Sequence, residues 1–237
     1  MRRIKALFLD IDGTLTVDRK SYALDLEAVE AVRSAVGKGI TVCLVSSNAL
    51  PIVVGLSRYL GLNGVAIGES GSIVYMKGKV VALASKPAKE PYRALLDRYG
   101  DFVEDTWQNY FRLYEFALKL REKYHDNWRN IVRELREYVE QRYPGFTVDY
   151  SGYALHVREA DVDKRRAVLF VLEKLGIKPE EAAGVGDSVM DVSFLSVLGL
   201  SAAVSNADDE LKSSVNLVLT KPSGKGVAEF IYKYLGV

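Results

Sequence analysis

The chain has 237 residues, 49% of them hydrophobic and 27% charged, the composition of an ordinary globular protein long enough to bury a full core. Its 32 Lys and Arg nearly balance its 31 Asp and Glu, so a formal net charge of +1 provides no basic field for nucleic acid or an anionic membrane surface. The single cysteine excludes an internal disulfide, and no apolar run approaches the roughly 18 residues of a membrane span, so we expect a cytoplasmic protein.

The first 78 residues alternate between strand and helix patterns. Residues 4–9 (IKALFL) and 40–45 (ITVCLV) are nearly continuous apolar runs, typical of parallel strands that are buried on both faces. Helical spacing of apolar residues lies between them, a second helix is expected near 50–60, and GVAI at 64–67 has the character of a third strand. This order predicts an α/β fold with a doubly wound, Rossmann-like parallel sheet.

Residues 79–157 follow a different pattern, which predicts a smaller inserted α+β domain. Residues 72–84 (SIVYMKGKVVALA) have the pattern of a hairpin. Apolar stripes predict two helices, from Tyr92 to Tyr99 and from Trp128 to Val139, and two short strands follow. The aromatic-rich segment 107–116 (WQNYFRLYEF) alternates, so we expect a strand that packs in the core rather than a platform for stacking bases.

The α/β pattern resumes after the insertion, so we expect one core domain built from residues 1–78 and 158–237. A helix is expected over 164–175, and AAGVG, SAAV and NLVL are short strands. Because ligands of open α/β sheets bind at the carboxyl ends of the strands, the residues that follow each strand predict the site. Those residues are Asp10 and Asp12 with Gly13, then Ser46, Ser47 and Asn48, then Asp187 and Asp191, and finally Ser205 and Asn206.

The four carboxylates predict a metal site. Asp10 and Asp12 would repel one another unless a cation joined them, and Asp187 and Asp191 are spaced to share one face of a helix start. Hard oxygen ligands of this kind suit Mg²⁺. Lys164 begins the predicted helix, where a cation opposes the positive end of the helix dipole unless an anion faces it. A solvated basic turn is the alternative for Lys164.

These motifs, in the order DIDGT, SSN, a lysine and GDSVMD, resemble those of the haloacid dehalogenase (HAD) superfamily of phosphatases. The insertion resembles that of the subgroup with an α/β (C2-type) cap, and chain length, insert position and the short GDSVMD loop are most similar to archaeal phosphoglycolate phosphatases. The chain departs from the family pattern at three positions. They are Ser47 in place of a usual glycine, Ser70 in the middle of the usual ENG, and Arg165 after the lysine.

The resemblance implies a role for each site residue. Asp10 would be the nucleophile, and Asp12 would act as acid and then base, with a pKa raised by neighbouring carboxylates. Mg²⁺ would be held by Asp10, the backbone carbonyl of Asp12 and Asp187, with Asp191 binding directly or through water. The phosphate would be bound by Lys164, Ser46, Asn48 and the backbone N–H groups of Ser47 and Gly13.

The implied activity is Mg²⁺-dependent hydrolysis of a small phosphorylated metabolite, with 2-phosphoglycolate as the first candidate. A phosphosugar phosphatase or phosphomutase is the second, and a non-catalytic binding protein is the third. Arg112 and Arg158 are candidates to bind a second anionic group of the substrate, whereas His156 is expected to be a packed or surface histidine. We expect a monomer or a homodimer that binds neither nucleic acid nor a membrane.

Overall fold

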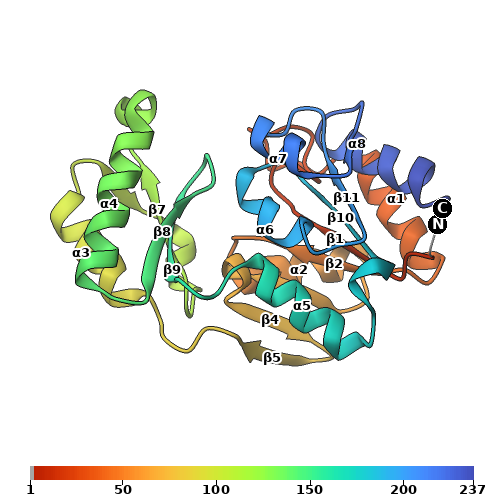
Figure 1. The fold of residues 1–237 in the computed structure, drawn as a ribbon, viewed down its shortest axis with the longest axis horizontal. Coiled ribbons are helices and arrows are strands. Elements are labelled where there is room, and N and C mark those ends of the chain that lie inside the picture. Colours follow the sequence, from red (N-terminus) through yellow and green to blue (C-terminus); the bar gives the residue numbers. More distant parts are fainter. Residues whose placement is uncertain (1–2) are drawn as a thin grey trace.

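The computed structural model describes residues 3–237, which form a large and a small β-sheet with helices around them (Figure 1). The strands of the large sheet are β1 (Ala6–Leu9), β2 (Thr41–Val45), β3 (Val65–Gly68), β4 (Ile73–Met76), β5 (Lys79–Ala82), β10 (Ala182–Gly186), β11 (Leu200–Ala203) and β12 (Leu217–Val218). They lie in the order β12-β11-β10-β1-β2-β3-β4-β5. β1 pairs in parallel with β10 on one side and β2 on the other, so the sheet grows in both directions from its first strand, as the doubly wound prediction requires.

Helices connect the parallel strands and cover the large sheet. They are α1 (Leu26–Gly37), α2 (Leu50–Leu60), α5 (Lys164–Leu175), α6 (Val192–Leu195), α7 (Asp209–Ser214) and α8 (Ser223–Glu229). The sequence sets their ends locally. Asp25 caps α1 by accepting from the backbone N–H of Ala28, and Asp163 caps α5 by accepting from that of Arg166. Gly61 and Gly176 end α2 and α5 in the left-handed conformation that glycine adopts without strain.

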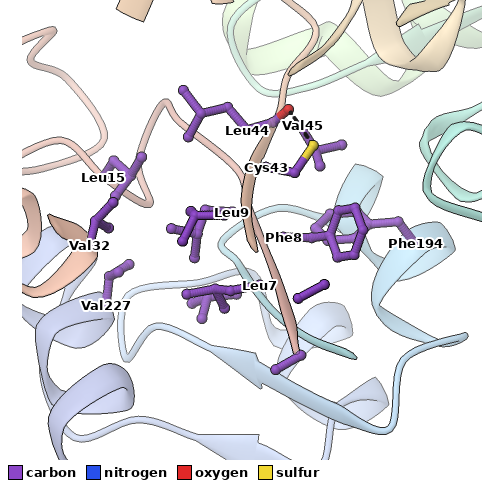
Figure 2. Packing of buried hydrophobic residues seen from close by; sticks show 14 of the residues in the cluster. Leu7, Phe8, Leu9, Leu15, Val32, Cys43, Leu44, Val45, Phe194 and Val227 are labelled. Atoms are coloured by element: carbon purple, nitrogen blue, oxygen red, sulfur yellow. Dashed lines mark hydrogen bonds between the residues drawn. The ribbon is translucent and has the colours of Figure 1, made fainter. Parts of the chain in front are cut away.

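The central strand β1 is buried on both faces of the sheet. Figure 2 shows the side chains of Leu7 and Leu9 on the side of Val32 and Val227, from α1 and α8, while Phe8 points the opposite way toward Phe194 of α6. All three β1 side chains have no exposed surface. This burial explains the continuous apolar run of the strand and makes it a rigid base for the polar loop that follows.

The small sheet belongs to a unit with a hydrophobic core of its own. Its strands are β6 (Val103–Asp105), β7 (Phe116–Leu120), β8 (Phe146–Tyr150) and β9 (Leu155–Glu159), antiparallel in the order β6-β7-β9-β8. The helices α3 (Lys89–Tyr99) and α4 (Trp128–Arg142) pack against it through the predicted apolar stripes, which contribute Tyr92, Leu95, Ile131 and Leu135 to this core. In Figure 1 this unit lies to one side of the large sheet.

Two sequence expectations need correction or adjustment. The alternating segment 107–116 was expected to form a core strand, but Trp107–Tyr110 is a 3-10 turn, and Trp107 and Tyr110 are largely exposed. The predicted hairpin is present, yet β5 pairs with β4 in the large sheet. The division of the chain into a core domain of residues 1–78 and 158–237 and an inserted domain of residues 79–157 stays a proposal. Because β5 belongs to the large sheet, the inserted domain would begin after residue 82. Among residues 3–237, no helix is long and apolar enough to cross a membrane.

Candidate active site

The loops after β1, β2 and β10 meet at one edge of the large sheet, because these three strands are parallel neighbours. A cleft of about 400 Å³ lies at this edge, between the loops and the inserted unit. Its walls bring together most of the predicted site. From the core they include Asp10, Asp12, Ser46, Ser47, Asn48, Lys164 and Asp187, and from the inserted unit Gln108, Arg112, Tyr153 and His156.

Three of the four predicted carboxylates form a compact buried cluster. Asp10, Asp187 and Asp191 each place an oxygen within 4.8 Å of the others. The turn after β10 folds back on itself, because Asp191 Oδ2 accepts from the backbone N–H groups of Asp187 and Ser188, both at 3.1 Å. Three buried carboxylates so close together, two of them at the wall of the cleft, are a set of hard oxygen donors that could hold a divalent cation.

Lys164 supplies a positive charge to this acidic cluster. Its Nζ donates to Asp10 Oδ1 at 2.8 Å and to Asp191 Oδ1 at 2.6 Å, and the residue is only 3% exposed. The alternative of a solvated basic turn is therefore wrong for Lys164. Burial opposes protonation, but the charges and hydrogen bonds of the two aspartates outweigh it and raise the pKa of Lys164. The conflict of this cation with the start of α5 is relieved by the two carboxylates, as the sequence suggested.

One lysine does not balance the cluster. Burial, followed by the charge of Asp191, raises the pKa of Asp10 well above its ordinary value. The same two causes raise the pKa of Asp187 to about 7. Lys164 and Arg19 lower the pKa of Asp187 but do not cancel these effects, so the three carboxylates together favour a further positive charge at this position.

Gly13 brings the backbone of the first loop against the acidic cluster. Its φ is +89°, a conformation that favours glycine, and an added Cβ would lie 2.3 Å from Asp187 Oδ2. Thr14 Oγ1 also donates to Asp187 Oδ1, at 3.2 Å. The glycine of the DIDGT motif thus allows the loop after β1 to contact the loop after β10.

Arg19 belongs to the site and was not predicted from the sequence. Its Nε lies 2.7 Å from Asp187 Oδ2, an ion pair without the alignment of a hydrogen bond, and its Nη1 donates to Asp208 Oδ1 at 2.7 Å. Asp208 in turn accepts from the backbone N–H of Val189. Arg19 stands in an exposed-looking stretch, VDRKS, with no motif to single it out, so only the folded loop reveals its role.

Asp12 is separate from the acidic cluster and is held by the loop after β2. Asn48 Nδ2 donates to Asp12 Oδ2 at 2.7 Å, and Ser46 Oγ accepts from the backbone N–H of Asn48 at 3.0 Å. The pKa of Asp12 is raised, as expected, but the predicted cause is wrong. Burial raises it, and Asn48 and Lys164 lower it, whereas neighbouring carboxylates play no part.

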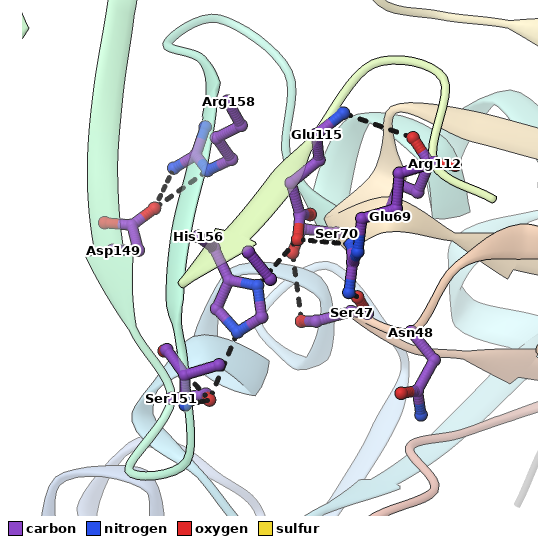
Figure 3. Close-up of polar contacts among 12 residues, drawn as sticks. Ser47, Asn48, Glu69, Ser70, Arg112, Glu115, Asp149, Ser151, His156 and Arg158 are labelled. Carbon is purple, nitrogen blue, oxygen red and sulfur yellow. Dashed lines mark hydrogen bonds and ion pairs between the residues drawn. The ribbon is translucent and has the colours of Figure 1, made fainter. Parts of the chain in front are cut away.

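The inserted unit contributes a buried polar cluster centred on Glu115 (Figure 3). Arg112 Nη1 donates to Glu115 Oε1 at 2.9 Å, and His156 Nδ1 lies 2.6 Å from the same oxygen. Burial alone would raise the pKa of Glu115, but the charges of His156 and Arg112 outweigh it and lower that pKa. His156 is 3% exposed and contacts Glu115 and Ser151, so of the two expected alternatives, packed or surface, it is the packed histidine.

The two arginines proposed to bind a second anion already have partners within the chain. Arg112 is occupied by Glu115 and by the backbone carbonyl of Ser47. Arg158 pairs with Asp149 and donates to three backbone carbonyls, as Figure 3 shows in part. Arg112 lines the cleft, whereas Arg158 lies on a different cavity.

Comparison with known proteins agrees with this geometry. The family profile of haloacid dehalogenase-like hydrolases matches residues 7–107 and 103–231. The chain is 46% identical over 233 residues to the phosphoglycolate phosphatase of Staphylothermus marinus, with 98% of each chain covered. It is 38% identical over 234 residues to phosphoglycolate phosphatase 1 of Saccharolobus solfataricus, with 98% of this chain and 96% of that protein covered.

A solved structure shares the fold over its full length. The crystal structure of Thermoplasma acidophilum 0175 superposes with a TM-score of 0.84 at 28% identity, covering 99% of each chain. The family match, the relatives and this shared architecture span both the large sheet and the inserted unit. The chain belongs to the haloacid dehalogenase-like hydrolases.

Proposed function

We propose that this protein is a Mg²⁺-dependent phosphatase that hydrolyses 2-phosphoglycolate to glycolate and phosphate. The observation that carries the proposal is the convergence of Asp10, Asp187, Asp191 and Lys164 at one sheet edge, with Asp12 beside them on the same loop as Asp10. A nucleophilic carboxylate, a cation site and a separate proton-transfer group are what hydrolysis of a phosphate monoester needs.

The acidic cluster fits the metal. Asp10, Asp187 and the backbone carbonyl of Asp12 would hold Mg²⁺, with Asp191 binding directly or through water. Oxygen donors from so few side chains suit an ion that keeps several of its waters. When bound, the ion would neutralise charge on the phosphate oxygens and on the attacking carboxylate. Lys164 shares that task, since its Nζ already contacts Asp10.

In the first half-reaction, a carboxylate oxygen of Asp10 attacks phosphorus as the bond to the leaving oxygen breaks. The leaving alkoxide takes a proton from Asp12, and an aspartyl-phosphate forms on Asp10. For this step Asp12 must carry a proton, and the rise of its pKa on burial supports that role. Ser46, Ser47 and Asn48 line the cleft and would bind the phosphate oxygens, together with the backbone N–H of Gly13 on the loop after β1.

In the second half-reaction, water attacks the phosphorus of the aspartyl-phosphate and gives its proton to Asp12. The bond between phosphorus and the Asp10 oxygen breaks, which releases phosphate and restores both carboxyl groups. One residue can be the acid and then the base because the two half-reactions mirror each other.

The choice of substrate rests on the relatives. Proteins 46% and 38% identical over nearly the whole chain are named phosphoglycolate phosphatase. A phosphosugar phosphatase or a phosphomutase on this scaffold is the alternative that the substrate test separates. Since phosphorylated metabolites are charged and do not cross membranes unaided, the proposal includes a cytoplasmic location. A monomer or a homodimer stays our prediction for the assembly, which light scattering can measure.

The test is phosphate release from 2-phosphoglycolate and a panel of sugar phosphates, with Mg²⁺ and with EDTA. We expect 2-phosphoglycolate to have the highest kcat/KM, EDTA to abolish turnover, and Asp10→Asn to remove activity on every substrate. Asp209→Asn is the matched control, because its fully exposed carboxylate lies on α7. Turnover by Asp10→Asn would contradict the nucleophile, and transfer of phosphate without its release would indicate a mutase.

A further inference from the structure

The 3-10 turn Trp107–Tyr110 of the inserted unit reaches into the core through one side chain, Gln108. Gln108 Oε1 accepts from the backbone N–H of Ala49 at 2.9 Å, and its Nε2 donates to Asn48 Oδ1 at 2.8 Å. Asn48 Nδ2 then donates to Asp12 Oδ2 at 2.7 Å. A continuous chain of hydrogen bonds thus links the inserted unit to Asp12.

The backbone N–H of Ala49 fixes the donor and acceptor directions in this series of hydrogen bonds. A backbone N–H can only donate, so the atom of Gln108 that faces Ala49 must be the carbonyl oxygen. The amide nitrogen of Gln108 must then face Asn48, which turns the carbonyl of Asn48 outward and its amide nitrogen toward Asp12. Without Gln108, no member of this series of hydrogen bonds would prevent the Asn48 amide from turning its carbonyl oxygen toward the carboxyl group of Asp12.

We propose that Gln108 is a positioning residue, which orients the carboxyl group of Asp12 through Asn48 when the inserted unit is docked on the core. The inference rests on the proposed function, in which Asp12 protonates the leaving group. With Oδ2 of Asp12 accepting from Asn48, the proton that Asp12 transfers is carried by Oδ1. Docking of the inserted unit thus selects the oxygen that faces the reaction.

The segment that carries Gln108 is anchored to the core on its far side as well. The buried carboxylate of Glu69, after β3, accepts from the backbone N–H groups of Leu113, Tyr114 and Glu115, the shortest bond being 2.8 Å to Tyr114. Arg112 Nη2 donates to the carbonyl of Ser47 at 2.9 Å. Gln108 can therefore reach Asn48 and Ala49 only when the segment 107–115 is bound to the core through Glu69 and Ser47.

The test compares two substrates that differ in their need for a proton. An alkoxide such as that of 2-phosphoglycolate must be protonated as it leaves, whereas the nitrophenolate of para-nitrophenyl phosphate leaves without a proton. We expect Gln108→Ala and Gln108→Glu to lower kcat/KM for 2-phosphoglycolate at least about tenfold more than for the aryl substrate. Gln108→Glu keeps the shape and the acceptor for Ala49 but replaces the donor to Asn48 with a negatively charged oxygen. Gln108→Met, which is neutral and of similar length, removes the donor without adding charge and should show the same difference between the two substrates.

Two further measurements separate positioning from a loss of packing. Inhibition by inorganic phosphate should change less than twofold in Gln108→Ala and Gln108→Met, because Gln108 bonds to Asn48 and Ala49 and its loss leaves Lys164 and Ser46 in place. Tyr110→Ala is the control from the same turn, since Tyr110 is 89% exposed, and it should match the native protein on both substrates. If Gln108→Ala unfolds, the neutral variant Gln108→Met replaces it in both measurements.

An equal loss on the two substrates, or no loss on either, would overturn the role of Gln108. Failure of the proposed function looks different. It would appear as turnover by Asp10→Asn, or as a native protein that hydrolyses neither substrate in the presence of Mg²⁺.

Discussion

Asp187→Asn should make the metal-free protein more stable at pH 8 while abolishing the response to Mg²⁺. The Asp187 carboxyl is 1% exposed and lies beside Asp10 and Asp191, so its charged form is unfavourable in the folded state. Its pKa rises from an ordinary 3.8 to about 7, so the folded state binds more protons than the unfolded state between these values. Stability of the metal-free protein therefore falls as pH rises through that window.

The size of the effect follows from the same pKa. A difference of one unit corresponds to about 1.36 kcal/mol, so the charged Asp187 costs at most about 4 kcal/mol above pH 7. Asparagine removes that charge and still accepts from Thr14, but it leaves Arg19 with Asp208 as its remaining carboxylate partner. We expect a net gain of about 2 kcal/mol at pH 8 that disappears by pH 5, because proton release from folded Asp187 between pH 5 and about 7 costs the native protein roughly 2–3 kcal/mol.

Urea unfolding in EDTA at pH 5 and pH 8 measures this directly, with Asp209→Asn as the exposed control. Adding Mg²⁺ at 100 times its dissociation constant should stabilise the native protein by about 2.7 kcal/mol and the Asp187→Asn variant far less. If Asp187→Asn were less stable than the native protein at pH 8 in EDTA, the reasoning that the cluster carries an unbalanced charge would be refuted.

Three more substitutions test the site and its attachment to the inserted unit. Lys164→Met removes two buried ion pairs, so we expect the free energy of unfolding in urea at pH 7 to fall by about 3–5 kcal/mol. We also expect kcat to fall by at least about 10²-fold, and native-like values for both quantities would refute the role of Lys164. Gly13→Ala places a Cβ against Asp187, so it should lower the Mg²⁺-dependent rise in melting temperature, and an unchanged rise would contradict the close contact. Glu69→Gln replaces one of the two carboxylate oxygens by an NH2 group, which cannot accept from the backbone N–H groups of residues 113–115, and removes the charge that strengthens the remaining bonds. It should cost about 1–3 kcal/mol and speed proteolysis within residues 106–115, whereas unaltered proteolysis would count against this anchor.

The core of the site could be predicted from the sequence because it depends on strand ends. Apolar runs locate β1, β2 and β10, and parallel neighbours carry their following loops to one edge, which brings Asp10 to Asp187. Lys164 was identified by its place in the order of motifs, and the dipole argument anticipated the anions that it contacts. The positions of residues at the ends of strands and helices can be predicted because the hydrophobic pattern in the sequence shows where those elements end.

Arg19 and Gln108 could not be found in this way, because each reaches its partner from an irregular segment. Arg19 depends on the path of the loop after β1, and Gln108 on how the inserted unit meets the core. The alternation of 107–116 was misleading because Trp107, Tyr110 and Phe111 are exposed, and of its aromatic residues only Phe116 at its end, the first residue of β7, is buried in the core of the inserted unit. Alternation of apolar and polar residues indicates a strand with one buried face only where the segment joins a sheet that is covered on that face.

The grip of Glu69 on residues 113–115 uses main-chain N–H groups, which every amino acid except proline provides. The exposed side chain of Leu113 is therefore free to vary without weakening this attachment between the two units. The exposed surface of the inserted unit can therefore change in sequence while the catalytic residues of the core stay the same, and the attachment through main-chain N–H groups does not restrict which side chains are accepted at that surface.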